Sequence, residues 1–267
     1  HLLGSLSAQV KDLYQAKKFL EKAIEIKNDY SETHYNLGNV LKDLGEIQKA
    51  INCFEKVIQI NPDNADAHNN LGNLLKKLGK IQDAESCYKK AIKINPNYAN
   101  AYNNLATIFQ KYKNFQEAIN LYEKTIQLNP NFALPYNNLG LIFHELEEYQ
   151  KAINSFEKAI KIKPDYAEAH SHLGMIFKEL GNFEQAINCF KTTLKYKPDD
   201  LITLHYLYDL NKEVLSSDLE EKIIQIINNK NSTKLNLAYG NFLLSIYELQ
   251  RKNYKNEFNF FIKGHDH

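Results

Sequence analysis

The chain has 267 residues, of which 43% are hydrophobic, and it carries 33 Lys and Arg against 32 Asp and Glu. The hydrophobic share can fill a core, while a formal net charge of +1 lacks the basic excess with which proteins bind nucleic acid. No run of about 18 apolar residues could cross a membrane, so we expect neither a nucleic acid nor a membrane as partner.

The first residue and the cysteines indicate the setting in which the chain works. The sequence begins with His1 and its only methionine is Met175, so we expect a fragment or a processed product. Three cysteines are too few for a disulfide framework in a chain of this length. We therefore expect a reducing, cytoplasmic setting and no disulfide among Cys53, Cys87 and Cys189.

A period of 34 residues runs along the chain, and such a period identifies a repeat architecture. Five of the six prolines follow it: Pro62, Pro96, Pro130, Pro164 and Pro198. An alanine recurs at the same spacing: Ala16, Ala50, Ala84, Ala118, Ala152 and Ala186. A glycine also recurs at this spacing, and Ala106 replaces it in one unit: Gly4, Gly38, Gly72, Gly140 and Gly174. The chain is therefore a series of similar units.

Each unit predicts two helices joined by a tight turn. We number positions within a unit from 1, so that Ser31 is position 1 of unit 31–64. Apolar residues recur at helical spacing at positions 4, 7, 8 and 11 and again at positions 17, 20, 21, 24, 27 and 28. Gly45 can end the first helix and Pro62 cannot continue the second. Small residues at positions 8 and 20 allow the two helices to approach closely.

These features together resemble the tetratricopeptide repeat. Residues 1–30 fit the pattern as a partial unit that begins inside a first helix. Five units are complete: 31–64, 65–98, 99–132, 133–166 and 167–200. The resemblance implies an all-α, right-handed superhelical solenoid of antiparallel helix pairs, with about six and a half repeats and one continuous core. It also implies a concave groove lined by the first helices.

The register weakens after Asp200, so we expect 1–200 to be the repeat array and 201–267 to be divergent C-terminal helical repeats that cap the same solenoid. A first helix over Leu201–Val214 and a second through residue 230 are predicted, with Glu220 at position 20. A loop over 228–233 then leads to a final hairpin. We expect its helices to cover 234–250 and the Phe-rich stretch beyond the turn at Lys252-Asn253.

The side of the first helices opposite the core carries the candidate binding residues. Positions 2, 6, 9 and 13 point away from positions 4, 7, 8 and 11 at about 100° per residue. Amides at positions 6 and 9 suit the N–H and C=O groups of an extended peptide. The candidates are Asn36, Asn70, Asn104, Asn138 and His172 at position 6, and Asn39 and Asn73 at position 9.

A second interpretation of these asparagines stays open, because Asn makes up 32 of the 267 residues and duplicated units inherit their composition. Under either interpretation, we expect Asn104→Ala to be near neutral or stabilising for folding. Tetratricopeptide domains that bind chaperone carboxylates carry Lys or Arg at positions 2, 5 and 6, and this chain lacks that basic clamp. The amides instead resemble those of the repeat domains preceding protein O-GlcNAc transferase.

Three apolar residues change the character of the later units: Leu134, Leu141 and Met175. They could anchor a hydrophobic side chain of a ligand. They could equally reflect drift on a solvated face or packing of the groove wall. Both interpretations stay open at this point.

No motif in the sequence indicates catalysis. There is no Gly-rich phosphate loop and no nucleophile elbow, so we expect no enzyme activity of the chain by itself and no cofactor. His265, Asp266 and His267 lie at the terminus without a second ligand cluster, so we expect no metal site.

The sequence therefore predicts a module that binds an extended peptide or a partner protein in its groove. One alternative is the substrate-recruiting region of a larger glycosyltransferase or sulfotransferase, whose arrays end in a similar divergent hairpin. Another is a scaffold that self-associates through its ends.

Overall fold

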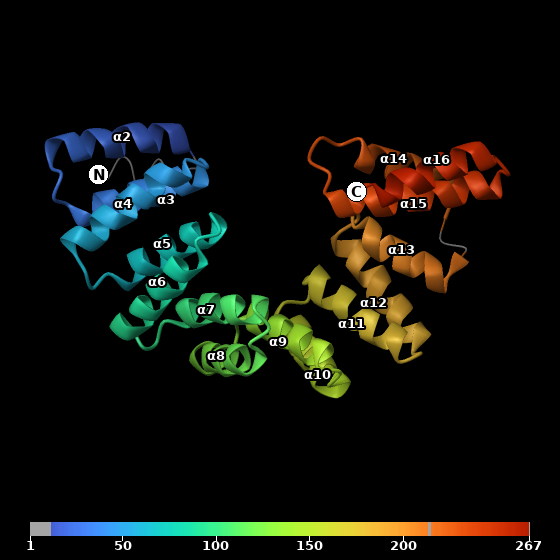
Figure 1. Ribbon diagram of the computed structural model, residues 1–267, viewed down its shortest axis with the longest axis horizontal. Coiled ribbons are helices and arrows are strands. Elements are labelled where there is room, and N and C mark those ends of the chain that lie inside the picture. Colours follow the sequence, from blue (N-terminus) through green and yellow to red (C-terminus); the bar gives the residue numbers. More distant parts are fainter. Residues whose placement is uncertain (1–11, 213–214, 267) are drawn as a thin grey trace. The chain divides into compact units, whose positions relative to one another are not determined.

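The computed structural model describes residues 12–212 and 215–266, which form fifteen helices and no strand (Figure 1). The predicted all-α class of paired helices is thereby confirmed. The chain groups into two compact units, His1–Asn131 and Phe132–His267. Each unit is described by itself. No helix in the described ranges is both long enough and apolar enough to cross a membrane.

The first unit holds three complete helix pairs and the second helix of the partial repeat. In each pair the two helices pack along each other and are joined by a short turn. The helices are α2 (Leu13–Ile26), α3 (Ser31–Asp43), α4 (Ile47–Ile60), α5 (Ala65–Lys77), α6 (Ile81–Ile94), α7 (Ala99–Lys111) and α8 (Phe115–Leu128).

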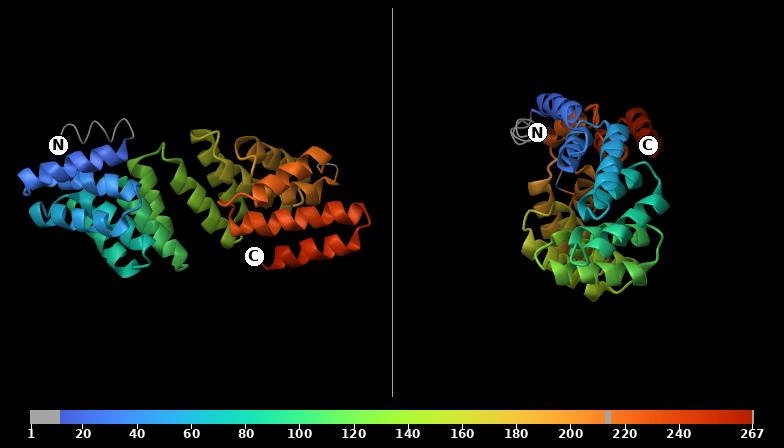
Figure 2. Two further views of the ribbon diagram at one scale, coloured as in Figure 1. Left: turned by 90° about the horizontal axis from the view of Figure 1, so that it is seen from above. Right: turned by 90° about the vertical axis from the view of Figure 1, so that its left-hand side faces the viewer.

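The second unit continues the pattern and ends in the long hairpin of α15 and α16, which lie side by side in Figures 1 and 2. Its helices are α9 (Ala133–Glu145), α10 (Tyr149–Ile162), α11 (Ala167–Glu179), α12 (Phe183–Tyr196), α13 (Leu201–Leu210), α14 (Ser217–Ile227), α15 (Lys234–Gln250) and α16 (Tyr254–His265).

The helices of a pair approach at the glycine of position 8, which faces the aromatic ring of position 24. A Cβ atom on Gly72 would lie 2.7 Å from Cε1 of Tyr88, and one on Gly140 would lie 2.6 Å from Cε1 of Phe156. Both distances are shorter than van der Waals contact, so a side chain at either glycine would displace the ring. The predicted need for a small residue at position 8 is confirmed.

The turn between the paired helices has a left-handed residue at position 15. Gly45 has φ +78° and Gly181 has φ +75°, as the sequence predicts for glycine at a helix end. Lys113 (φ 59°) and Glu147 (φ 60°) adopt the same conformation without being glycine. In those two repeats the residue type does not favour the left-handed conformation, so the packing of the two helices holds the turn in it.

The C-terminal register differs from the prediction. The helix predicted to reach Val214 ends at Leu210, and residues 213 and 214 lie outside the described ranges. Ile223 of α14 is fully shielded from solvent, whereas the side chain of Glu220 binds Arg251. Glu220 is thus not the core position 20.

The turn of the final hairpin has the backbone conformation seen in the turns of the repeats. Lys252 is left-handed (φ 59°), which makes it position 15 and Ala238 position 1, 37 residues after Leu201 instead of 34. Gly240 then occupies position 3, where a Cβ atom would lie 2.3 Å from Cγ2 of Ile227. Assignment of this hairpin to the repeat array stays a prediction.

Candidate functional site

Position 6 asparagines in the first unit bind the preceding repeat. Asn70 Nδ2 donates to Tyr35 Oη at 3.1 Å, and Asn104 Nδ2 donates to Asn69 Oδ1 at 2.9 Å. Tyr35 and Asn69 are the position 5 residues of the repeats before. Asn69 is 4% exposed, so this bond satisfies a buried amide. The predicted ligand-facing amides therefore also join neighbouring repeats.

These bonds fix which end of each amide remains available. The Nδ2 groups of Asn70 and Asn104 donate hydrogen bonds to the preceding repeat. No described residue donates to the Oδ1 atom of either side chain. At position 9 the opposite holds, because Asn39 Oδ1 accepts from Lys42 Nζ at 3.2 Å and Asn73 Oδ1 accepts from Tyr88 Oη at 2.7 Å.

Two polar rows result on α3, α5 and α7, which we call the amide face: the residues at positions 2, 6 and 9 of these three helices. Position 6 offers the oxygen atoms of Asn70 and Asn104 as acceptors, and position 9 offers the Nδ2 groups of Asn39 and Asn73 as donors. All four side chains are half-buried and still reach solvent. The face can therefore bind both the N–H and the C=O groups of a peptide backbone.

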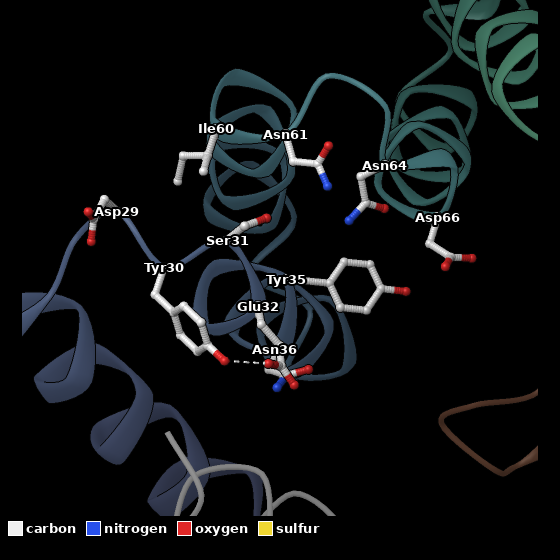
Figure 3. Close-up of a pocket in the computed structure, with 10 residues that line it drawn as sticks. All are labelled: Asp29, Tyr30, Ser31, Glu32, Tyr35, Asn36, Ile60, Asn61, Asn64 and Asp66. Atoms are coloured by element: carbon white, nitrogen blue, oxygen red, sulfur yellow. Dashed lines mark hydrogen bonds between the residues drawn. The ribbon is translucent and has the colours of Figure 1, made fainter.

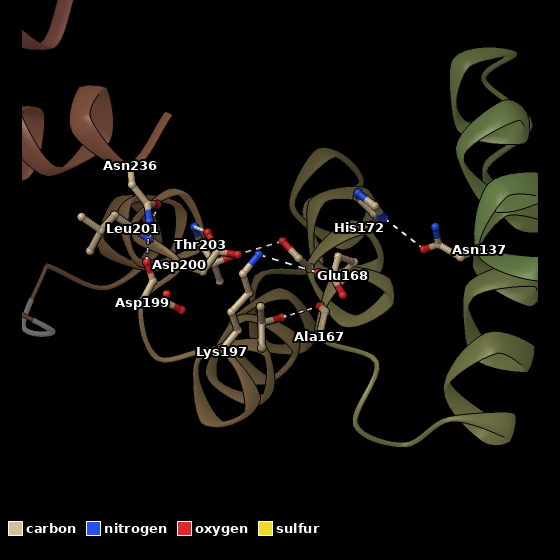
Figure 4. Close-up of polar contacts among 12 residues, drawn as sticks. Asn137, Ala167, Glu168, His172, Lys197, Asp199, Asp200, Leu201, Thr203 and Asn236 are labelled. Atoms are coloured by element: carbon tan, nitrogen blue, oxygen red, sulfur yellow. Dashed lines mark hydrogen bonds and ion pairs between the residues drawn. The ribbon is translucent and has the colours of Figure 1, made fainter. Parts of the chain in front are cut away.

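Position 6 of the second unit carries Asn138 and His172. His172 Nδ1 donates to Asn137 Oδ1 at 3.2 Å, which repeats the contact between position 6 and the preceding position 5 (Figure 4). The imidazole also lies against Phe156, with ring centroids 5.5 Å apart. Burial lowers the pKa of His172 to about 4, so the ring is neutral at pH 7. His172 is therefore a packed, uncharged member of the row.

The three apolar candidates lie at the margin of the core. Leu141 packs against the cluster of α10 and α11, and Met175 packs against the cluster that contains Phe190 and Leu207. Leu134 is half-buried. Leu141 and Met175 therefore contact neighbouring helices, and both interpretations of the three apolar residues stay open.

A pocket of about 620 Å³ opens beside the amide face in the first unit (Figure 3). The start of α3, the end of α4 and the start of α5 surround it. Tyr30 Oη donates to Glu32 Oε2 at 2.8 Å, and Tyr98 Oη, from the last position of the same repeat as Asp66, donates to Asp66 Oδ1 at 2.5 Å. The lining residues are Asp29, Tyr30, Ser31, Glu32, Tyr35, Asn36, Ile60, Asn61, Asn64 and Asp66.

The sequence analysis missed the role of histidine at position 4. His34, His68 and His170 each donate from Nε2 to a backbone carbonyl six residues earlier, at 2.8, 3.0 and 2.9 Å. The acceptor belongs to the turn that precedes the unit, and it is Pro62 or Pro164 in two of the three cases. These histidines hold the turn between repeats. The recurrence of His and Pro at this spacing was the available signal.

The cysteines and the metal-ligating side chains of the described ranges were the remaining candidates for chemistry. The three cysteines are free and half-buried, and burial raises the pKa of each thiol to about 11, so they are poor nucleophiles. No group of three His, Cys, Asp or Glu side chains in the described ranges could hold a metal ion. His267, one of the terminal candidates, lies outside those ranges.

Family models described as tetratricopeptide repeats match most of the chain. The general repeat model matches residues 65–98, 99–132 and 167–200. Further repeat models match residues 1–30, 38–79, 121–154 and 140–181. Together the matches cover residues 1–30 and 38–200. No curated protein matches the chain.

Solved repeat proteins share the fold. The crystal structure of MamA is 26% identical with a TM-score of 0.56, and the match covers 62% of this chain and 97% of that one. Pseudomonas aeruginosa pilF is 20% identical with a TM-score of 0.69, over 78% of this chain and 95% of that one. YrrB, a repeat protein described as having an unusual peptide-binding site, is 20% identical with a TM-score of 0.55, over 70% and 96%.

Proposed function

The chain belongs to the tetratricopeptide repeat family, and we propose that it is a protein-interaction module that binds an extended peptide segment across the amide face. The observation that carries the proposal is the pairing of a row of acceptors with a row of donors. The N–H and C=O groups of any peptide backbone can form hydrogen bonds with both rows. The description of YrrB as a repeat protein with a peptide-binding site supports the same class of ligand.

The spacing of the repeats favours one peptide conformation. Packed helices lie about 10 Å apart, so the same position recurs at that interval from α3 to α5 to α7. A polyproline II segment has three residues per turn and rises about 3.1 Å per residue, so it repeats at about 9 Å. Every third residue would present the same backbone groups to successive repeats. We therefore expect the bound segment to adopt this conformation.

The two alternatives from the sequence stay predictions. Similarity to the repeat domains of glycosyltransferases or sulfotransferases is absent from the matches described above. No contact in the described residues favours self-association over binding of a different protein.

The test removes the donors of the amide face without removing the contacts that these side chains make within the protein. Dodecapeptides are selected on the chain from a random phage-displayed library, and their affinities are measured by fluorescence anisotropy. In the double variant Asn39→Asp with Asn73→Asp, the carboxylates still accept from Lys42 and Tyr88. Two donors to the peptide are lost, so we expect affinity to fall by about tenfold or more.

A matched control makes the same change on the second helices. Asn52 Oδ1 accepts from Gln48 Nε2 and Asn120 Oδ1 accepts from Gln116 Nε2, both at 3.1 Å and both exposed. The double variant Asn52→Asp with Asn120→Asp should bind like the unaltered chain. Equal affinities for both double variants would reject the amide face as the binding surface.

A further inference from the structure

Helix α16 exposes a row of large apolar side chains. Tyr254 and Phe258 are each 63% exposed, and Phe261 and Ile262 are 46% and 42% exposed. The four residues recur at the i, i+4, i+7 and i+8 spacing of one helix face, and we call them the aromatic stripe. Apolar residues scattered singly are normal on a protein surface, whereas a contiguous row of them marks an interaction surface.

The earlier helix pairs show how the corresponding surface is covered. The second helices α4, α6, α10 and α12 each pack against the first helix of the next pair. Their aromatic ring at position 24 is fully buried: Phe54, Tyr88, Phe156 and Phe190. Phe261 follows the left-handed Lys252 at the same interval, but its ring is largely exposed. In the described ranges α16 packs chiefly against α15 (Figure 2), so the stripe corresponds to a surface that another helix covers elsewhere.

One flank of the stripe carries opposite charges at its two ends. Lys255 lies in the first turn of α16 and Asp266 is its C-cap residue, and both side chains are exposed. At about 100° per residue they lie within about 20° of each other around the helix, so they flank the stripe on the same side. Lys263 lies instead over the ring of Phe260, away from the stripe. The flank is therefore basic where α16 begins and acidic where it ends.

An antiparallel pair of α16 helices makes these two ends complementary. A two-fold axis beside Phe261 places Lys255 of each copy opposite Asp266 of the other copy, so the pair contains this contact twice. The same axis sets Phe258 of each copy at the height of Ile262 of the other, so the two stripes face each other. A parallel pair in register would instead place like charges side by side. Charge complementarity therefore favours a second, antiparallel copy of the same helix.

We propose that a second copy of this chain covers the aromatic stripe in an antiparallel pair of α16 helices. Both copies use the same surface, so the contact closes at a dimer and does not extend into a filament. The stripe belongs to the unit of residues 132–267, whereas the amide face belongs to residues 1–131. Dimerisation therefore uses none of the residues proposed to bind peptide, and the two proposals stand or fall separately.

Sedimentation equilibrium of the chain across a wide dilution series tests the proposal. We expect a monomer and a dimer in equilibrium, the dimer having twice the chain mass of 31.0 kDa. The variant Phe258→Glu places a carboxylate in both halves of the contact, so the dissociation constant of the dimer should rise by about thirtyfold or more. The control Phe183→Glu makes the same change at an exposed ring on α12 and should leave the dissociation constant unchanged.

Charge reversal tests the antiparallel arrangement. Lys255→Glu and Asp266→Lys each bring like charges together across the pair, so each variant should weaken the dimer by about fivefold or more. The double variant that carries both substitutions restores two pairs of opposite charge in reversed order. We expect it to dimerise like the unaltered chain.

Four results would overturn the proposal. A chain that is monomeric at every concentration would show that no second copy covers the stripe and would leave it to a different protein. Species larger than a dimer would show a contact that does not close. Equal weakening by Phe258→Glu and Phe183→Glu would place the association on another surface. A double charge variant as weak as the two single variants would reject the antiparallel pair.

Discussion

At the scale of single residues, the side chain at position 6 joins each repeat to the one before it. Asn70, Asn104 and His172 all bind the position 5 residue of the preceding repeat. The contact spans 35 residues in every case. Period and composition predicted which face these side chains occupy. They could not predict this partner, because the offset between stacked helices is set by packing and is invisible in one unit.

The expected effect of Asn104→Ala changes accordingly. The sequence alone predicted a neutral or stabilising substitution, but alanine leaves the buried Oδ1 of Asn69 without its donor. We now expect the free energy of unfolding in urea to fall by about 1–2 kcal/mol. Asn100→Ala, at an exposed position of the same helix, should change it by less than about 0.5 kcal/mol. Equal effects of the two substitutions would show that the hydrogen bond contributes nothing.

His172 makes stability depend on pH. Its pKa falls from the ordinary value of 6.5 to about 4 in the folded chain because burial disfavours the charged ring. Between these values the unfolded chain binds a proton that the folded chain does not. Stability is therefore full above about pH 6.5 and is lost as pH falls towards 4, by at most about 1.4 kcal/mol per pH unit.

The variant His172→Asn separates this effect from other titrations. It recreates the pair of amides seen at Asn104 and Asn69 and carries no titratable group. Urea unfolding between pH 7 and 4.5 should show a shallower loss of stability in this variant. A slope identical to that of the unaltered chain would contradict the assignment, and the remaining slope should include His205, whose pKa burial also lowers.

At the scale of the helix pair, the sequence predicted small residues at two positions where the helices pack together. Glycine at position 8 meets the ring at position 24, and alanine at position 20 is fully buried. The left-handed turn at Lys113 and Glu147 was not visible, since neither residue favours that conformation by itself. The turn at Lys252 was also not visible, because it lies three residues out of the 34-residue register.

Overpacking tests the contact within a pair. Ala118 lies at position 20 of its unit and is 0% exposed, so Ala118→Leu adds bulk where no space exists. We expect the free energy of unfolding to fall by about 1–3 kcal/mol. Glu123→Leu, at an exposed position of the same helix, serves as the control and should be near neutral. Near-equal midpoints in urea for the two variants would contradict close packing at position 20.

At the scale of the molecule, the candidate site lies within one compact unit. The amide rows and the pocket beside them both belong to residues 1–131, whereas His172 and Met175 belong to the unit of residues 132–267. The sequence predicted a single ladder of polar groups from Asn36 to His172. It identified most residues of the amide face, but not the pocket, because Asp29, Asn61 and Asp66 come together only when successive repeats stack.

Photo-crosslinking tests the central claim most directly, because it records where the peptide lies. A selected dodecapeptide carrying benzoylphenylalanine is irradiated with the chain, and the adducts are located by mass spectrometry. The account predicts adducts at positions 2, 6 and 9 of α3, α5 and α7, competed away by the unlabelled peptide. Competed adducts confined to α4, α6 and α8 would contradict it.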